Sequence, residues 1–183
     1  LGVILPGARA AVRHGKRIGV ISTPATAASN AYRNAIQEIS PNAQVWQVGC
    51  PKFVPLIEQN RIYDPHTKEV ARQYLNPLLE KNIDTLVYGC THYRHLKPVF
   101  QEILPATVQL IDPASYVVKA AQKELEILGL TNSTLTLPTR FGVSGCPEIF
   151  TQLSQQWLGF LPNVEKICLP SVASPSLSME FMD

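Results

Sequence analysis

Short apolar stretches alternate with amphipathic stretches along nearly the whole chain, and this order restricts the possible folds more than any other feature. The apolar stretches are rich in β-branched residues, which is typical of buried strands. We predict strands at 17–22, 43–48, 85–88, 108–111, 140–143 and 164–169. Helices are predicted at 6–12, 27–39, 53–59, 65–82, 95–104, 113–128 and 147–158, with Pro77 expected to kink or divide one of them. Strands that alternate with helices favour a doubly wound α/β fold with a parallel sheet.

The composition indicates a globular chain with reduced cysteines. Hydrophobic residues make up 45% of the sequence, no apolar run is long enough to span a membrane, and no signal peptide opens it. The four cysteines are widely separated and form no C-x-x-C pair, which argues against a zinc ribbon. The net charge is only +2 and the basic residues are scattered, which argues against a nucleic-acid partner. We therefore expect a soluble protein of the cytoplasm, with neither nucleic acid nor membrane as a partner.

One candidate site follows the strand predicted at 85–88, where the sequence reads Gly89-Cys90-Thr91-His92. In open α/β sheets, ligands bind beyond the carboxyl ends of the strands. A helix beginning close behind Cys90 is expected to lower the pKa of its thiol through free N–H groups and the helix dipole. His92 could then exchange or stabilise a proton. The alternative is that Cys90 is a buried packing residue, as most lone cysteines are.

A second candidate site lies at the turn after the strand predicted at 17–22. Thr23 and Thr26 flank this strand-to-helix turn. Their hydroxyls and the free backbone N–H groups of the turn could hold a carboxylate. The competing interpretation is simple helix capping, by Thr26 especially. The chemistry of the residues leaves both interpretations open.

Four stretches together resemble the glutamate racemases. They are Gly19 to Thr26, Cys50 to Glu58, Gly89 to Tyr93 and Leu110 to Asp112, in that family's order and roughly its spacing. The resemblance extends from residue 1 to about residue 169. The family has an N-terminal part, carrying its first catalytic cysteine, that is not found in this sequence. We therefore expect the chain to be a fragment or a processed product.

The resemblance implies a fold of two similar α/β lobes, in which the chain crosses to the second lobe and returns. Residues 1–112 would form the complete second lobe. Residues 113–170 would be the returning part of the first lobe, and residues 171–183 a mobile tail.

The resemblance also implies cofactor-independent racemisation of L- and D-glutamate by two opposed cysteines. Cys90 and His92 would be the catalytic residues on this side, and His92, Thr91, Thr23, Thr26 and Glu58 would contact or support the substrate. D-glutamate would supply peptidoglycan synthesis, so a bacterial cytoplasm is implied. Family members are often dimers, so a homodimer is a further expectation. Because the first cysteine is not found, we expect the chain alone to have little or no racemase activity.

Two residues depart from the family's pattern, and three alternatives stay open. Ser22 stands where the family usually has glycine, and Arg94 where it commonly has proline. Aspartate racemase belongs to the same superfamily, but its motif usually carries an acid in place of His92. The chain could also be a non-catalytic binding or regulatory remnant of a racemase. An unrelated α/β domain with Cys90 as a nucleophile is the third alternative.

Overall fold

The computed structural model describes residues 1–132 and 138–169, and the chain divides into two compact units, Leu1–Ser133 and Thr134–Asp183. The first unit contains a four-stranded parallel sheet in the order β2-β1-β3-β4. Its strands are β1 (Arg17–Ser22), β2 (Gln44–Gly49), β3 (Thr85–Gly89) and β4 (Gln109–Ile111). β1 and β3 are almost wholly buried, as their apolar, β-branched sequences predict.

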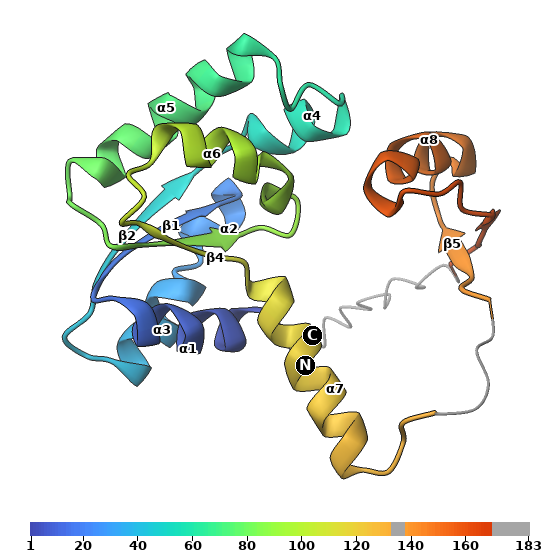
Figure 1. Cartoon of the computed structure of the whole chain (residues 1–183), viewed down its shortest axis with the longest axis horizontal. Coiled ribbons are helices and arrows are strands. Elements are labelled where there is room, and N and C mark those ends of the chain that lie inside the picture. The colour runs from blue at the N-terminus through green and yellow to red at the C-terminus, as the bar shows by residue number, and fades with distance from the viewer. Residues whose placement is uncertain (133–137, 170–183) are drawn as a thin grey trace, which may run out of the picture. The chain divides into compact units, whose positions relative to one another are not determined.

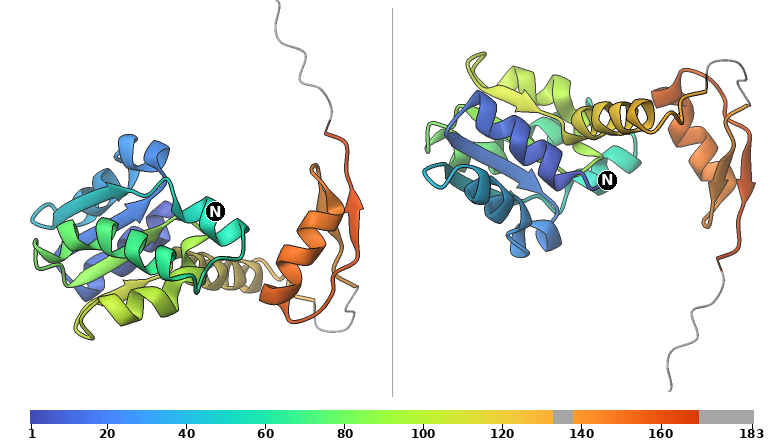
Figure 2. Two further views of the ribbon diagram at one scale, coloured as in Figure 1. Left: turned by 90° about the horizontal axis from the view of Figure 1, so that it is seen from above. Right: turned by 90° about the horizontal axis from the view of Figure 1, so that it is seen from below.

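Helices cover both faces of this sheet (Figure 1). One layer contains α1 (Ile4–His14), α3 (Ala31–Ile39) and α7 (Pro113–Ile127), and the other contains α4 (Phe53–Glu58), α5 (Pro65–Leu79) and α6 (Lys97–Ile103). Seen from above, the helices of the second layer lie in front of the sheet, and seen from below, α1 lies in front (Figure 2). The predicted parallel, doubly wound α/β arrangement is therefore confirmed.

Each helix layer packs against one face of the sheet and forms a separate hydrophobic core with it. Phe53, Leu75 and Phe100 are fully buried on the side of α4, α5 and α6, whereas Ile18 and Ile36 are fully buried on the other side. Side chains on successive strand residues point to opposite faces, so neighbouring residues of one buried strand serve both cores. Because the strands are packed on both faces, their carboxyl ends are held in a fixed position.

Several helix boundaries differ from the predicted ones by one to three residues, and three differences concern more than a terminal residue. The helix expected at 27–39 is divided into α2 (Pro24–Ala28) and α3, because Asn30 adopts a left-handed backbone conformation with φ of 54°. The helix expected at 95–104 is a 3₁₀ turn, η1 (Tyr93–Leu96), followed by α6. Pro77 does not divide α5, which ends two residues later at Leu79.

The second unit is described over residues 138–169. It consists of β5 (Phe141–Val143), α8 (Pro147–Leu158) and β6 (Val164–Lys166), with the two strands paired in parallel. Phe141 packs against Phe150 and Phe160, whose ring centroids lie 6.4 and 6.2 Å from its own. The tail predicted at 171–183 lies outside the described residues. The division expected between residues 112 and 113 stays a prediction.

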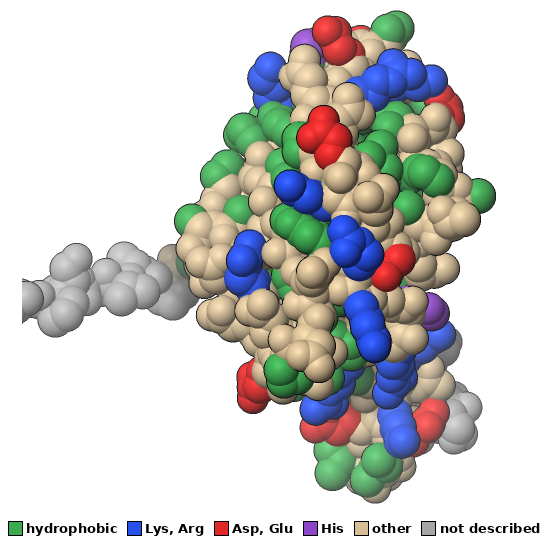
Figure 3. Space-filling model, turned by 90° about the vertical axis from the view of Figure 1, so that its left-hand side faces the viewer, with side chains coloured by type: hydrophobic (Ala, Val, Ile, Leu, Met, Phe, Trp, Pro, Cys, Tyr) green, Lys and Arg blue, Asp and Glu red, His purple; other side chains and the backbone are tan. Residues whose placement is uncertain are grey.

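Charges of both signs share the surface. On the face in Figure 3, lysine and arginine side chains (blue) lie among acidic (red) and uncharged ones. No helix within residues 1–132 and 138–169 is long and apolar enough to cross a membrane. The expectation that nucleic acid is not a partner stays a prediction.

Candidate active site

The ends of three parallel strands lie at one level. Ser22 of β1 pairs with Gly49 of β2 on one side and with Gly89 of β3 on the other. The residues that follow them, Thr23 and Cys90 among them, therefore emerge together at the carboxyl edge of the sheet. This shared register brings together segments far apart in the sequence.

Gly89 allows the strands to approach closely at this level. A Cβ atom at this position would lie 2.8 Å from the Ser22 Cβ, which is too close, and 3.0 Å from the Ile21 carbonyl oxygen, which is unusually tight. The backbone of Gly89 does not have a positive φ, since Gly129 and Gly159 are the glycines in that conformation within the described residues. Glycine is thus needed at position 89 for space, rather than for a special turn.

A pocket of about 190 Å³ opens at this edge. Its wall includes four of the six predicted site residues: Thr23, Thr26, Cys90 and Thr91. A thiol and three hydroxyls therefore face one cavity, from the ends of β1 and β3. The remaining two predicted residues, His92 and Glu58, are outside the pocket wall.

His92 links Cys90 to Glu58. The Cys90 Sγ lies 3.8 Å from His92 Nδ1, and His92 Nε2 lies 3.4 Å from Glu58 Oε1. In the tautomer that fits both contacts, Nε2–H faces the carboxylate and Nδ1 faces the thiol. The three side chains can therefore pass a proton from the thiol to the imidazole and stabilise the resulting charge.

The predicted lowering of the Cys90 pKa is wrong. Burial raises the pKa of this half-buried thiol above its ordinary value, and hydrogen bonds from the backbone N–H groups of His92 and Tyr93 oppose the shift only in part. The segment behind Cys90 is the short 3₁₀ turn η1, not the first turn of a long α-helix. Such a turn has only a small dipole, so burial decides the direction.

Alkylation of Cys90 is therefore expected to be slow at neutral pH. The thiolate is the reactive form, so the reaction rate with iodoacetamide should keep rising with pH beyond 9.0, the ordinary value for a thiol. Peptide mass spectrometry over a pH series measures this rate. The exposed Cys146, labelled in the same sample, shows that the reagent is active. A Cys90 rate that reaches its plateau below pH 9 would contradict the expected shift.

Thr23 caps the turn after β1, and both Thr23 and Thr26 line the pocket. Thr23 is the N-cap of α2: its Oγ1 accepts a hydrogen bond from the Thr26 backbone N–H at 3.4 Å. The Thr23 hydroxyl also lies 3.0 Å from the Thr26 hydroxyl. The capping residue is therefore Thr23, whereas the capping interpretation had favoured Thr26. Capping does not exclude a role at the pocket, because both residues line it.

Three further polar side chains line the pocket without having been predicted there: Tyr32, Tyr88 and Asp112. Asp112 follows β4, so the same strand-end argument could have found it. Asp112 is also the N-cap of α7, where its Oδ1 accepts a hydrogen bond from the Ala114 backbone N–H at 3.1 Å. Burial raises the pKa of Tyr32 to about 12, so its hydroxyl stays protonated. Tyr32 lies on α3 and Tyr88 within a buried strand, where no sequence signal marks a pocket residue.

Of the other three cysteines, Cys50 also follows a strand, β2, but it does not line this pocket. Its side chain is buried, its thiol contacts the Val48 carbonyl oxygen at 3.5 Å, and burial raises its pKa to about 12. Cys146 and Cys168 belong to the second unit, where both are exposed. Cys90 is therefore the one thiol at the pocket among the described residues.

Comparison with known proteins agrees with this geometry. The family model for Asp/Glu/Hydantoin racemase matches residues 1–121, which include the sheet and the pocket. The chain belongs to the Asp/Glu/Hydantoin racemase family. Among curated family members, the chain is 69% identical to a glutamate racemase of Gloeothece citriformis over 183 residues, which is all of this chain and 66% of that protein. It is 71% identical to one of Synechocystis over 174 residues, or 95% of this chain and 62% of that protein.

Solved structures of family members show the same fold. The glutamate racemase RacE1 of Bacillus anthracis matches with a TM-score of 0.87 and 32% identity, over 93% of this chain and 65% of that one. The glutamate racemase of Francisella tularensis, solved with D-glutamate, matches with a TM-score of 0.84 and 34% identity, over 91% of this chain and 62% of that one. The chain spans between 60% and 66% of the length of four curated racemases that it matches.

Proposed function

We propose that this chain forms one side of a two-sided glutamate racemase active site, with Cys90 as its acid–base group. The observation that carries the proposal is the position of Cys90 in the pocket wall beside Thr23, Thr26 and Thr91, with His92 within reach of its sulfur. The identity to glutamate racemases and the D-glutamate complex of the Francisella enzyme support glutamate as the substrate.

Racemisation requires removal of a proton from a weakly acidic carbon on one face and return of a proton on the other. When Cys90 is a thiolate, it takes the Cα proton and becomes a thiol, while the C–H electron pair stays on the carbon and its carboxylate. A group on the opposite face then donates a proton to the same carbon. In the reverse direction Cys90 is the acid, so each direction leaves the site ready for the other.

His92 and Glu58 would set the protonation state of Cys90. Because burial keeps the thiol protonated, formation of the thiolate needs a base, and His92 Nδ1 is in position to accept that proton. Glu58 would hold the ring through Nε2–H and stabilise its positive charge. Hydroxyls of Thr23, Thr26 and Thr91 would fix the carboxylates and the ammonium group, so that Cα faces the sulfur.

Protection of Cys90 from alkylation tests this proposal. Glutamate bound at the threonines would cover the sulfur, so saturating D- or L-glutamate is expected to slow alkylation severalfold. Aspartate, one methylene shorter, is expected to protect less. Peptide mass spectrometry gives the rate at Cys90, with Cys146 as the internal control. Equal rates with and without glutamate, or equal slowing at Cys146, would contradict the proposed site, and stronger protection by aspartate would contradict the proposed substrate.

Other expectations accompany the proposal. The D-glutamate product would serve peptidoglycan synthesis in a bacterial cytoplasm, and the reaction as written uses no cofactor. The cytoplasmic location, the independence from a cofactor and a homodimeric assembly stay predictions.

A further inference from the structure

A second cavity, of about 280 Å³, lies beside the candidate active-site pocket. The two cavities share Tyr88 and Asp112 in their walls. The second one is also lined by Leu110 of the edge strand β4 and by residues of η1, α6 and α7. Its basic lining residues are Arg94, Lys97 and Lys119.

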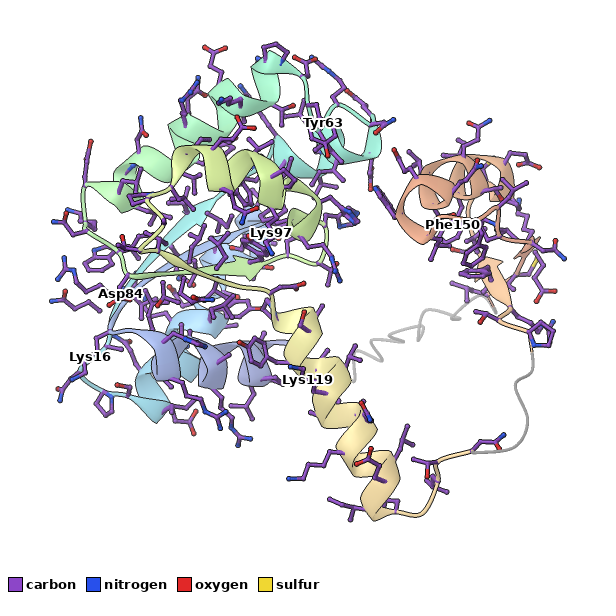
Figure 4. The ribbon with its side chains drawn as sticks, viewed as in Figure 1. Lys16, Tyr63, Asp84, Lys97, Lys119 and Phe150 are labelled. Carbon is purple, nitrogen blue, oxygen red and sulfur yellow. The ribbon has the colours of Figure 1, made fainter. Side chains whose placement is uncertain are left out.

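The three basic side chains come from three different elements. Arg94 lies in η1, Lys97 is the first residue of α6, and Lys119 lies in α7. Figure 4 labels Lys97 and Lys119 on the side where β3 and β4 end, away from Lys16 and Asp84 at the beginnings of the strands. Three elements of the fold, η1, α6 and α7, therefore each place one basic side chain in the wall of this cavity.

Only part of this charge is neutralised within the protein. Asp112 is the acidic residue of the cavity wall, and its Oδ2 lies 3.7 Å from Arg94 Nη1. The same carboxylate also caps α7 and accepts a hydrogen bond from the Ser115 hydroxyl at 3.4 Å. Neither Lys97 nor Lys119 forms an ion pair with any residue in the part of the chain that the structure describes. The cavity thus carries two positive charges without a counter-ion.

The Tyr88 side chain adds an unused hydrogen-bond donor. Tyr88 is 3% exposed, and its buried hydroxyl has no hydrogen-bond partner among residues 1–132 and 138–169. Burial, and then the nearby Asp112, raise the pKa of this hydroxyl, so it stays protonated. Buried polar groups in proteins almost always have a partner, and Tyr88 lies in the walls of both cavities, so its hydroxyl is an available hydrogen-bond donor at this site.

We propose that this second cavity binds a phosphate monoester dianion. Two unpaired lysines match its two negative charges, and the Tyr88 hydroxyl and the Arg94 guanidinium supply further donors to the phosphate oxygens. The side chains of Leu110 and Tyr116 form a less polar wall for the organic group of the ester. The ligand is therefore distinct from the amino-acid substrate of the neighbouring pocket, and the inference goes beyond the proposed racemisation.

Isothermal titration calorimetry at constant ionic strength tests the proposal, with inorganic phosphate and glycerol 3-phosphate as probes. Both are expected to bind the 183-residue chain saturably, and the ester at least as tightly as phosphate. Lys97→Ala and Lys119→Ala are each expected to weaken binding about tenfold, the usual effect of losing one charge-assisted hydrogen bond. Tyr88→Phe is expected to weaken binding as well. Lys123→Ala is the matched control, because Lys123 lies one turn beyond Lys119 on α7 and does not line the cavity.

Circular dichroism of each variant verifies the fold, and the two substituted lysines are exposed, so their replacement leaves the core intact. The absence of saturable binding to the unsubstituted chain would overturn the proposal. A loss with Lys123→Ala as large as with Lys119→Ala would overturn it too, because it would indicate diffuse attraction. Strict competition by glutamate, in which the apparent Kd for phosphate rises without limit as the glutamate concentration increases, would place the anion in the active-site pocket instead. These binding results are independent of the Cys90 protection experiment, so either proposal can fail alone.

Discussion

Incubated with L-glutamate, the 183-residue chain is expected to form D-glutamate at least about 100-fold more slowly than a full-length glutamate racemase, the usual minimum loss when one acid–base group is removed. Among the described residues, Cys90 is the one thiol at the pocket, and a single group serves one face of Cα. Cys50 cannot easily replace the second group, because its thiol is buried and burial raises its pKa to about 12. Chiral chromatography of the product measures the rate.

The 69%-identical Gloeothece enzyme is a suitable full-length reference. Exchange of the Cα proton in heavy water, followed by NMR, separates removal of the proton from full racemisation. Any slow exchange by the chain is expected to disappear in Cys90→Ser, because a serine hydroxyl is a far weaker acid than a thiol. Racemisation by the unsubstituted chain at the rate of the reference would show that a second acid–base group is present in this polypeptide. Activity retained in Cys90→Ser would remove Cys90 from its proposed role.

Replacement of Phe53 with alanine is expected to lower the free energy of unfolding of the first unit by about 3–5 kcal/mol, the usual cost of removing a buried phenylalanine ring. Phe53 is fully buried, and its ring lies 5.1 Å from the rings of both Tyr74 and Tyr93. It is also the first residue of α4, which carries Glu58. The cavity would therefore loosen the core and the support of Glu58 together.

Urea unfolding followed by tryptophan fluorescence measures this loss. The chain has two tryptophans, Trp46 on β2 and Trp157 on α8, so a Trp157→Phe background makes the signal specific to the first unit. Tyr63→Ala is the matched control, because Tyr63 is 81% exposed and its loss should change the free energy by less than about 0.5 kcal/mol. Its position at the outer surface near α4 is visible in Figure 4. Equal urea midpoints for the Phe53→Ala and Tyr63→Ala variants would mean that the packing of Phe53 against Tyr74 and Tyr93 contributes little to the stability of this unit.

The strands and the location of the site could be predicted because they depend on local pattern. β1 was predicted with its observed bounds, since a run of Ile and Val between polar residues specifies a buried strand. Ligands of open α/β sheets bind beyond the carboxyl ends of the strands, so the segments after β1 and β3 were each predicted as candidate sites. Cys90, Thr91, Thr23 and Thr26 do line one pocket.

The features that sequence reasoning missed depend on the folded environment. The sign of the Cys90 pKa shift is a balance between burial, which raises the pKa, and two backbone hydrogen bonds, which lower it. The sequence indicates that backbone N–H groups follow Cys90, but it does not indicate how deeply the thiol is buried. The break before α3 rests on the left-handed backbone of Asn30, which its neighbours in sequence do not reveal. Tyr32 and Tyr88 line the pocket because of the way α3 and β3 pack against the rest of the first unit. Such residues resemble ordinary core residues until the packing is known.

Tyr88 and Asp112 each belong to the walls of two cavities, and this has a thermodynamic consequence. A ligand that reorients either side chain in one cavity also changes the shape and charge presented to the other. Linkage requires the effect to be reciprocal, so the factor by which the first ligand changes the affinity for the second equals the factor in the opposite direction. If glutamate and a phosphate ester each reorient one of these side chains, the concentration of one solute would therefore change the apparent affinity of this protein for the other.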